Sequence, residues 1–184
     1  MNKNSTAVRN TAIFGSRMVV MSGLLIAMSI VLGKFLAFNI GTSIRISFEN
    51  LPILMAGIFF GATVGGIVGL GADLIGCIMA GYAINPVITL GAFLIGFLSG
   101  FVSHHILKKN HSFPAMVCAI LSAHVIGSML IKSIGMYIYY HTAIEVLAMR
   151  IPIYIVTGIC ETYIIYLLLQ NKAFSAQVEK MCRK

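Results

Sequence analysis

The 184-residue chain is 59% hydrophobic, only 10% of its residues are charged, and its mean hydropathy is +0.96. A soluble domain carries about 25% charged residues, so this composition excludes a soluble globular protein and indicates that lipid is the solvent. The formal net charge of +8 does not indicate nucleic-acid binding, because the basic residues lie at the ends of apolar runs and form no basic stripe with an aromatic platform.

Apolar runs divide the chain into six predicted helices, at about 20 residues for each spanning helix. The predicted helices are residues 18–38, 51–60, 63–80, 86–107, 114–140 and 150–170. Pro52, Pro86 and Pro114 lie at or near the starts of three of them, where a helix tolerates proline. The second helix is too short to span an unperturbed bilayer, so we expect it to be tilted or only partly inserted.

Polar segments are expected between these helices. Residues 39–50 and 141–149 are predicted as loops, and the polar tail after residue 170 is expected to lie at the membrane surface. The predicted fold is therefore an all-α membrane protein, a bundle of six transmembrane helices forming a single domain over residues 1–184. We expect it in the cell membrane as a multi-pass protein.

The distribution of basic residues predicts the orientation of the bundle. With both termini inside, the inner set holds nine basic residues and the outer set four, which agrees with the positive-inside rule. The inner residues are Lys3, Arg9, Arg17, Lys108, Lys109, Lys172, Lys180, Arg183 and Lys184, and the outer ones are Lys34, Arg45, Lys132 and Arg150. We therefore predict cytoplasmic N and C termini.

Ionisable residues inside the predicted helices are candidates for function, because each costs about 2.5–3.5 kcal/mol or more at mid-membrane. Asp73, His124, Glu161 and Lys132 qualify. At about 1.5 Å per residue, His124 and Glu161 reach a similar depth. They are interpreted either as an internal pair that fixes helix register or as groups that meet Asp73 or a ligand.

Cations and aromatic residues are expected together near the outer face. Arg45, Lys132 and Arg150 would attract an anionic solute, although an arginine there is also an ordinary interfacial anchor. The tyrosines at this level are Tyr82, Tyr137, Tyr139 and Tyr140, and an interfacial aromatic belt explains them equally well. Asn85 and Thr89 add uncharged polar groups. Such a pocket suits a planar heteroaromatic anion.

Small residues recur four positions apart, a spacing that lets helices approach closely in lipid. The matches are Gly23-xxx-Ala27, Gly61-xxx-Gly65-xxx-Gly69 and Ala92-xxx-Gly96-xxx-Gly100. Internal packing explains each of them. The alternative for Gly23 and Ala27 is that this face of the first helix docks another membrane subunit.

Motifs for chemistry are missing from the sequence. The chain has no G-x-x-x-x-G-K-[ST] phosphate loop, so it is not its own ATPase. It has no HExxH, GxSxG or cysteine–histidine nucleophile pattern, and its four cysteines show no metal-ligand spacing, so we expect no enzyme activity, cofactor or metal. The two halves show no inverted repeat, which weakens a secondary-transporter interpretation.

The order of several short motifs resembles the substrate-binding S components of energy-coupling factor (ECF) vitamin transporters, and the later ones are similar to the folate type. The motifs are IRISFENLPI at 44–53, AGIFFG at 56–61, GLGADLIG at 69–76, NPVITLGA at 85–92, HVIGS at 124–128, then Lys132-Ser133, Arg150-Ile151-Pro152 and Glu161. The resemblance covers about residues 23–171.

The resemblance implies a six-helix bundle that binds a vitamin at its outer face. It also implies a complex with a transmembrane coupling subunit and two ATPase subunits, in which the S component is thought to topple to release its vitamin inside. The family's alanine-xxx-alanine docking motif falls on Gly23-xxx-Ala27, where glycine replaces the first alanine but keeps the position small.

Folate satisfies the predicted pocket, because its tail carries two carboxylates and its pterin ring has an amino-pyrimidine edge. We expect Arg45, Lys132 and Arg150 to bind the tail. Another set, Asp73, Asn85 and Thr89, is expected to bind the ring. The wider set of expected substrate-binding residues also includes His124, Tyr137 and Glu161.

Two other functions remain open from the sequence. The same architecture can serve another vitamin or precursor, such as pantothenate. A stand-alone secondary carrier would instead use Asp73, Glu161 and His124 as a proton relay.

Overall fold

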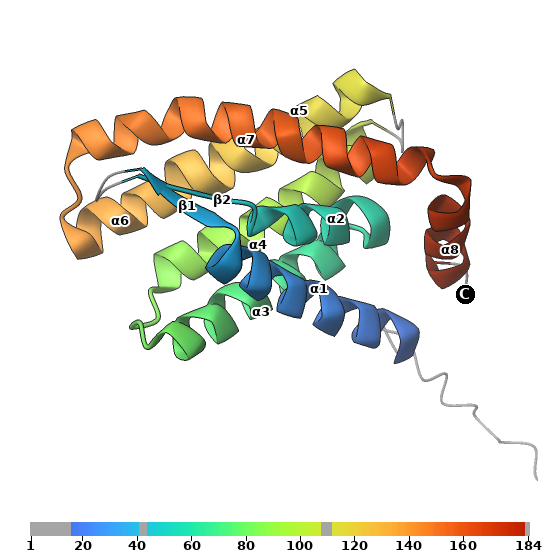
Figure 1. The fold of residues 1–184 in the computed structure, drawn as a ribbon, viewed down its shortest axis with the longest axis horizontal. Coiled ribbons are helices and arrows are strands. Elements are labelled where there is room, and N and C mark those ends of the chain that lie inside the picture. The colour runs from blue at the N-terminus through green and yellow to red at the C-terminus, as the bar shows by residue number, and fades with distance from the viewer. Residues whose placement is uncertain (1–15, 41–43, 108–111, 183–184) are drawn as a thin grey trace, which may run out of the picture.

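The computed structural model describes residues 16–40, 44–107 and 112–182. Within them it contains eight α-helices, two π-helical segments and one hairpin of two strands (Figure 1). Several basic residues used in the orientation prediction lie outside these ranges, namely Lys3, Arg9, Lys108, Lys109, Arg183 and Lys184.

Five helices in the described part of the chain are long and apolar enough to cross a membrane. Three of them are single segments: α1 (Ser16–Phe35), α3 (Ala62–Ala80) and α7 (Ile144–Gln170). The fourth is α4 (Pro86–Phe101) continued by the π-helical segment η1 (Val102–Ile106). The fifth consists of α5 (Phe113–Ala123), the π-helical segment η2 (His124–Ile131) and α6 (Lys132–Tyr140). Their starts and ends agree with the predicted helices within a few residues, except at the end of α1 and the start of α7.

The short helix α2 (Asn50–Phe60) forms the centre of the core. Its residues from Asn50 to Phe59 are all buried, and it packs against α1, α3 and α4. An 11-residue helix rises only about 16 Å at 1.5 Å per residue, so the burial of all its sides, rather than its length, accounts for its position. The sequence prediction placed this helix correctly within one residue.

Glycines let α2, α3 and α4 approach one another closely. A Cβ added to Gly65 would lie 2.6 Å from the Cα of Gly57, and one added to Gly100 would lie 2.6 Å from the backbone nitrogen of Ala62. Cβ additions at Gly69 and Gly96 would meet backbone atoms of the facing helix as well. The small-residue patterns of α3 and α4 are therefore used for internal packing.

The prediction was wrong where the first helix ends. Ala37 and Phe38 belong to strand β1 (Ala37–Ile40), which pairs antiparallel with β2 (Ile44–Ser47). The predicted loop at 39–50 therefore contains the end of β1 and all of β2, and Asn50 begins α2. Apolar residues continue from α1 into β1 without a break, so hydropathy alone did not show where helix gives way to strand.

The helix α7 begins six residues before the predicted start at residue 150, and only residues 141–143 connect it to α6. His141 ends α6 with a φ of 48°, in the left-handed region that closes many helices. The predicted loop at 141–149 was therefore wrong. Glu145 lies in the first turn of α7, where a carboxylate is favourable near the helix N-terminus.

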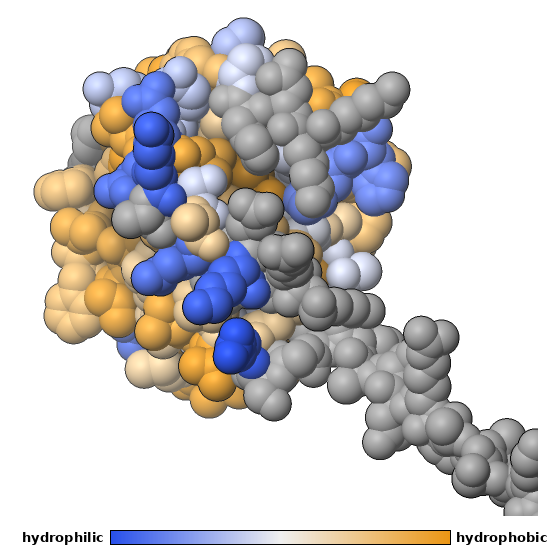
Figure 2. Space-filling view, turned by 90° about the vertical axis from the view of Figure 1, so that its right-hand side faces the viewer, coloured by the Kyte–Doolittle hydropathy of each residue, from blue (hydrophilic) through white to orange (hydrophobic). Residues whose placement is uncertain are grey.

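The polar tail forms the helix α8 (Lys172–Cys182), which the sequence analysis did not predict. Phe174 and Val178 of α8 pack against the core, and the Phe174 ring lies edge-on to Phe59 at 5.5 Å between centroids. The helix α8 and the first turn of α1 lie at the same end of the molecule (Figure 1). Figure 2 looks onto this end and shows hydrophilic residues gathered on it, with hydrophobic residues around them.

Candidate functional site

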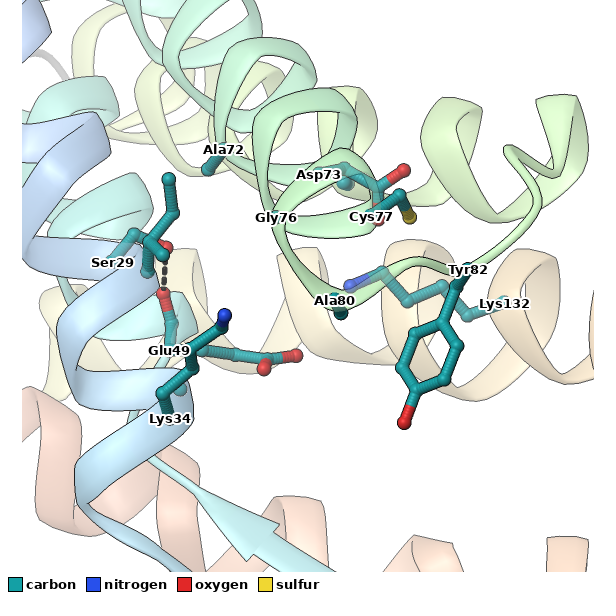
Figure 3. A pocket seen from close by; sticks show the side chains of 13 residues that line it. Ser29, Lys34, Glu49, Ala72, Asp73, Gly76, Cys77, Ala80, Tyr82 and Lys132 are labelled. Carbon is teal, nitrogen blue, oxygen red and sulfur yellow. Dashed lines mark hydrogen bonds between the residues drawn. The ribbon is translucent and has the colours of Figure 1, made fainter.

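A pocket of about 210 Å³ opens between α1, α3, the start of α2 and the Lys132 end of η2 (Figure 3). It lies among residues at the end of α1 and α3 remote from α8 (Figure 1). Lysine, carboxylate, hydroxyl and tyrosine side chains line it together with small apolar residues. The lining residues are Ser29, Ile30, Gly33, Lys34, Glu49, Ala72, Asp73, Gly76, Cys77, Ala80, Tyr82, Ala92 and Lys132.

Asp73 lies in the wall of this pocket, on α3. Its Oδ2 accepts a 2.6 Å hydrogen bond from the hydroxyl of Thr89 on α4, so the two helices present these polar groups together. A short hydrogen bond from a hydroxyl fixes the orientation of a carboxylate. The structure thus brings together Asp73 and Thr89, two residues that the sequence analysis assigned to one side of a ligand.

Asn85 caps the N-terminus of α4. Its Oδ1 accepts hydrogen bonds from the backbone N–H groups of Val87 at 3.0 Å and Ile88 at 3.4 Å, as an N-cap residue does. The sequence predicted the helix start here but not the cap. The Nδ2 atom of Asn85 is buried and has no hydrogen-bond partner among the described residues, so one donor beside Thr89 remains unsatisfied.

Lys132 enters the pocket from the opposite side, at the junction of η2 and α6. Its side chain is only 8% exposed, and a Cβ added to Gly91 would lie 2.6 Å from its Cγ. The lysine stem therefore occupies space on α4 that is free because Gly91 has no side chain. No carboxylate in the described part of the chain lies within salt-bridge distance of this ammonium group.

Glu49 and Lys34 also line the pocket, and the sequence analysis did not assign either to the site. Glu49 lies between β2 and α2 with its side chain toward the pocket (Figure 3), packed over Gly33 of α1. Its backbone carbonyl accepts a 2.6 Å hydrogen bond from Ser29. Lys34 donates to the carbonyl of Met79 at 3.1 Å and so joins α1 to the end of α3. Because the hairpin was not predicted, nothing placed Glu49 opposite Asp73.

His124 and Glu161 form a fully buried pair away from the pocket lining. Each is 0% exposed, and His124 Nε2 lies 2.6 Å from Glu161 Oε2. His124 Nδ1 lies 3.2 Å from the Ser128 hydroxyl, and the ring stacks on Tyr154 at 5.4 Å between centroids. The pair joins the start of η2 to α7, which agrees with the interpretation as an internal pair between helices.

Arg150 lies on α7 and does not line the pocket. It donates a 2.9 Å hydrogen bond to the hydroxyl of Tyr154, contacts the sulfur of Met136, and lies 5.3 Å from the centroid of the Tyr154 ring. The predicted grouping of Arg150 with Lys132 is therefore not present: the guanidinium is engaged by α6 and α7.

Two further residues were predicted to bind the substrate, Tyr137 and Arg45. Tyr137 is 52% exposed and borders an apolar groove between α6 and α7, not the pocket that Lys132 lines. Arg45 belongs to β2, but its side chain lies outside the part of the structure that is described.

Gly23 and Ala27 face outward from α1. Both are exposed, and a Cβ added to Gly23 would have nothing within 4 Å. Exposed Val19, Val20 and Leu24 surround them, so this face is apolar and carries a shallow strip of small residues.

The fold of this chain is similar to the folds of solved S components of ECF transporters. The fold resembles the crystal structure of FolT bound with folic acid, with a TM-score of 0.69 and 25% identity, over 87% of this chain and 98% of that one. It also resembles an S component of a bacterial ECF transporter, with a TM-score of 0.64 and 23% identity over 88% and 98% of the two chains. The S component for biotin from an ECF-type ABC transporter gives a TM-score of 0.68 and 18% identity over 87% and 94%.

A sequence search among curated proteins found no match. The family model for the substrate-specific component of ECF transporters matches residues 17–169, which includes every residue that lines the pocket. Members of this family are substrate-binding transporter subunits of the vitamin-binding kind, not enzymes, and they associate with coupling and ATPase modules. This chain is a multi-pass membrane protein that belongs to the family of ECF transporter substrate-specific components.

Proposed function

We propose that this chain is the folate-binding S component of an ECF-type ABC vitamin importer. It captures folate at the outer face of the cell membrane and delivers it through a complex with a coupling subunit and two ATPase subunits. The likeness to FolT bound with folic acid supports this substrate. The observation that carries the proposal is Lys132, a buried ammonium group in the pocket with no salt-bridge partner among the described residues.

A buried unpaired charge is costly in an apolar bundle, so an anionic ligand would be stabilised at Lys132. Folate brings two carboxylates on its tail, and we assign one of them to Lys132. Arg45, a residue of β2, is the proposed second partner. Arg150 would first have to release Tyr154, so we do not assign it to the tail.

The carboxylates in the pocket lining suit the pterin ring. Asp73 and Glu49 offer carboxylate oxygens to the amino-pyrimidine edge, a donor edge that two acceptors satisfy. Asn85 caps α4 and is not among the residues that line the pocket, so we do not assign its Nδ2 to the ring. Thr89 holds Asp73 in place through its 2.6 Å hydrogen bond. Leaving any of these groups unpaired costs about 1–3 kcal/mol, which gives the site its selectivity.

The remaining parts of the proposal concern orientation and assembly. We propose six membrane crossings with both termini in the cytoplasm. The common end occupied by α8 and the start of α1 supports an even number of crossings (Figure 1), and exposed Lys172 and Lys180 on α8 fit the positive-inside rule. Gly23 and Ala27 on α1 are the proposed contact with the coupling subunit.

Folate titration into the purified protein tests the substrate. We expect one folate bound per chain. In the Lys132→Ala variant we expect an affinity about 10- to 100-fold lower, because a hydrogen bond to a charged group contributes about 1.5–3 kcal/mol. Lys172→Ala, which removes an exposed lysine of α8 at the other end, is the matched control and should bind as the parent does. A folded parent that binds no folate would refute the proposal.

Competition separates folate from other vitamins. The biotin S component has nearly the same TM-score as FolT against this chain, so the fold alone does not choose the ligand. We expect unlabelled folate, but neither biotin nor pantothenate, to displace labelled folate. Uptake by this chain alone in proteoliposomes, driven by a pH gradient, would instead support a secondary carrier. The structure does not favour that relay, since Asp73 bonds to Thr89 while His124 bonds to Glu161.

A further inference from the structure

The segment between His124 and Lys132 is π-helical over eight residues, His124–Ile131. Such segments are rare, usually span a single turn and occur frequently at functional sites. Here the segment ends directly before the lysine that enters the pocket, and the backbone N–H of Lys132 bonds to the carbonyl of Gly127, five residues back. A wider turn changes the angle at which each later side chain leaves the helix. The length of η2 therefore determines which way Lys132 points.

Polar contacts run along this segment from α7 to α6. Glu161 lies 2.6 Å from His124, and His124 lies 3.2 Å from the hydroxyl of Ser128. The carbonyl of Ser128 accepts a 3.4 Å hydrogen bond from Ser133, the residue after Lys132. All of these residues are buried. The contacts thus connect both ends of η2 and attach its start to α7.

We propose that the His124–Glu161 pair is a positioning device for Lys132: it attaches the first residue of η2 to α7 and so sets the direction in which the ammonium group enters the pocket. His124 and Glu161 do not touch the ligand and are positioning residues. Neither lines the pocket, which separates their role from that of Asp73 and Lys132. This inference rests on the proposed function in one respect, the binding of an anionic ligand at Lys132.

Packing around Lys132 makes its direction sensitive to such a shift. The lysine stem fills the space left by Gly91, and a Cβ on Gly91 would also lie 2.8 Å from the carbonyl of Gly127 in η2. A small rotation of η2 would therefore press the stem against α4 or turn it toward the exposed face that carries Leu130 and Ile134. Either movement removes the charge from the pocket.

A double-mutant cycle tests the positioning role. We expect Glu161→Gln to lower folate affinity about tenfold in the parent and less than about twofold in a Lys132→Ala background, since coupled residues are not additive. Thr162→Val is the matched control, because Thr162 is equally buried on α7 but bonds only to the carbonyl of Gly158 within that helix; it should leave the affinity unchanged. Equal losses from Glu161→Gln in both backgrounds would overturn the inference.

A second measurement needs no vitamin and so distinguishes failure of this inference from failure of the proposed function. In a variant without the native cysteines, Lys132→Cys is labelled with a charged thiosulfonate, which reaches a thiol in the water-filled pocket but not one that faces lipid. We expect fast labelling, and expect Glu161→Gln to slow it toward the rate of Ile134→Cys on the exposed face. An unchanged rate with Glu161→Gln would overturn the inference, whether or not folate binds.

Discussion

Small residues four positions apart occur on α3 and α4 and again on α1, with opposite surroundings. Gly65 and Gly96 are buried against backbone atoms of neighbouring helices. Gly23 and Ala27 are exposed. Lipid gives helices little hydrophobic reason to associate, so close backbone approach carries much of the packing energy. The spacing thus shows that a face permits close approach, and the fold decides whether a partner inside the chain already occupies it.

Replacing a glycine by a larger residue should therefore have different consequences on α3 and on α1. At Gly65 of α3, a larger side chain has no space, because the nearest atoms are backbone and cannot rotate away. At Gly23 of α1, an added Cβ meets no atom of the described residues within 4 Å, so the effect of a larger side chain there falls on whatever docks at this face.

Gly65→Leu should prevent stable folding. A Cβ at this position already lies 2.6 Å from the Cα of Gly57, so we expect the free energy of unfolding to fall by more than about 3 kcal/mol, beyond the usual cost of overpacking. The measurement is the fraction of monodisperse protein that remains after heating in detergent. Gly23→Leu adds the same atoms on α1 at an exposed position and should not lower the midpoint. Equal midpoints for the two variants would contradict the close approach of α2 and α3.

The double variant Gly23→Leu/Ala27→Leu should fold and bind folate as the parent does but lose its partner. We expect its affinity for the coupling subunit to fall at least about tenfold, or about 1.4 kcal/mol, because the bulky side chains hold the helices apart. Co-purification with a tagged coupling subunit measures it. Ala148→Leu, at an exposed position on α7, is the control. If the double variant still co-purified at the parent level, the coupling subunit would have to dock elsewhere.

The spanning helices and one buried pair were predictable from the sequence. Long apolar runs set the positions of the spanning helices, since lipid requires every backbone polar group to be satisfied within a helix. Depth along two such helices was enough to anticipate the His124–Glu161 pair. Of the residues expected to bind the substrate, Asp73 and Lys132 line the pocket and Thr89 bonds to Asp73; that they bind a ligand stays a prediction.

Other features depend on contacts between distant residues. The hairpin of β1 and β2 is a pairing that helical hydropathy does not reveal, and without it Glu49 had no place in the site. The direction of Arg150 depends on its contacts with Tyr154 on the same helix and with Met136 on α6, which charge and depth leave open. The helix α8 owes its position to Phe174 and Val178 packing on the core, and a short amphipathic tail gives no sign of that from its composition.

Gly71→Ala tests an intermediate case between the two faces. The nearest atom to an added Cβ is the Cδ1 of Ile26 on α1, at 2.8 Å, which is the end of a flexible side chain. The unfavourable rotamer should cost about 0.5–1.5 kcal/mol and offset most of the gain of about 1 kcal/mol from the helix propensity of alanine, so the midpoint on heating should lie below that of Gly23→Ala. Ile26→Val removes the crowded methyl group, so the double variant should recover much of this cost. No recovery would place the strain in the backbone instead.

Gly23→Ala should stabilise the fold slightly. Alanine is about 1 kcal/mol better than glycine in a helix interior, and here nothing lies within 4 Å of the added Cβ. We therefore expect a slightly higher midpoint on heating, with co-purification of the coupling subunit unchanged because alanine keeps the face small. Gly65→Ala, with the same change in propensity at a closed position, should lower the midpoint. A lower midpoint for Gly23→Ala would show that α1 meets another part of this chain at that face.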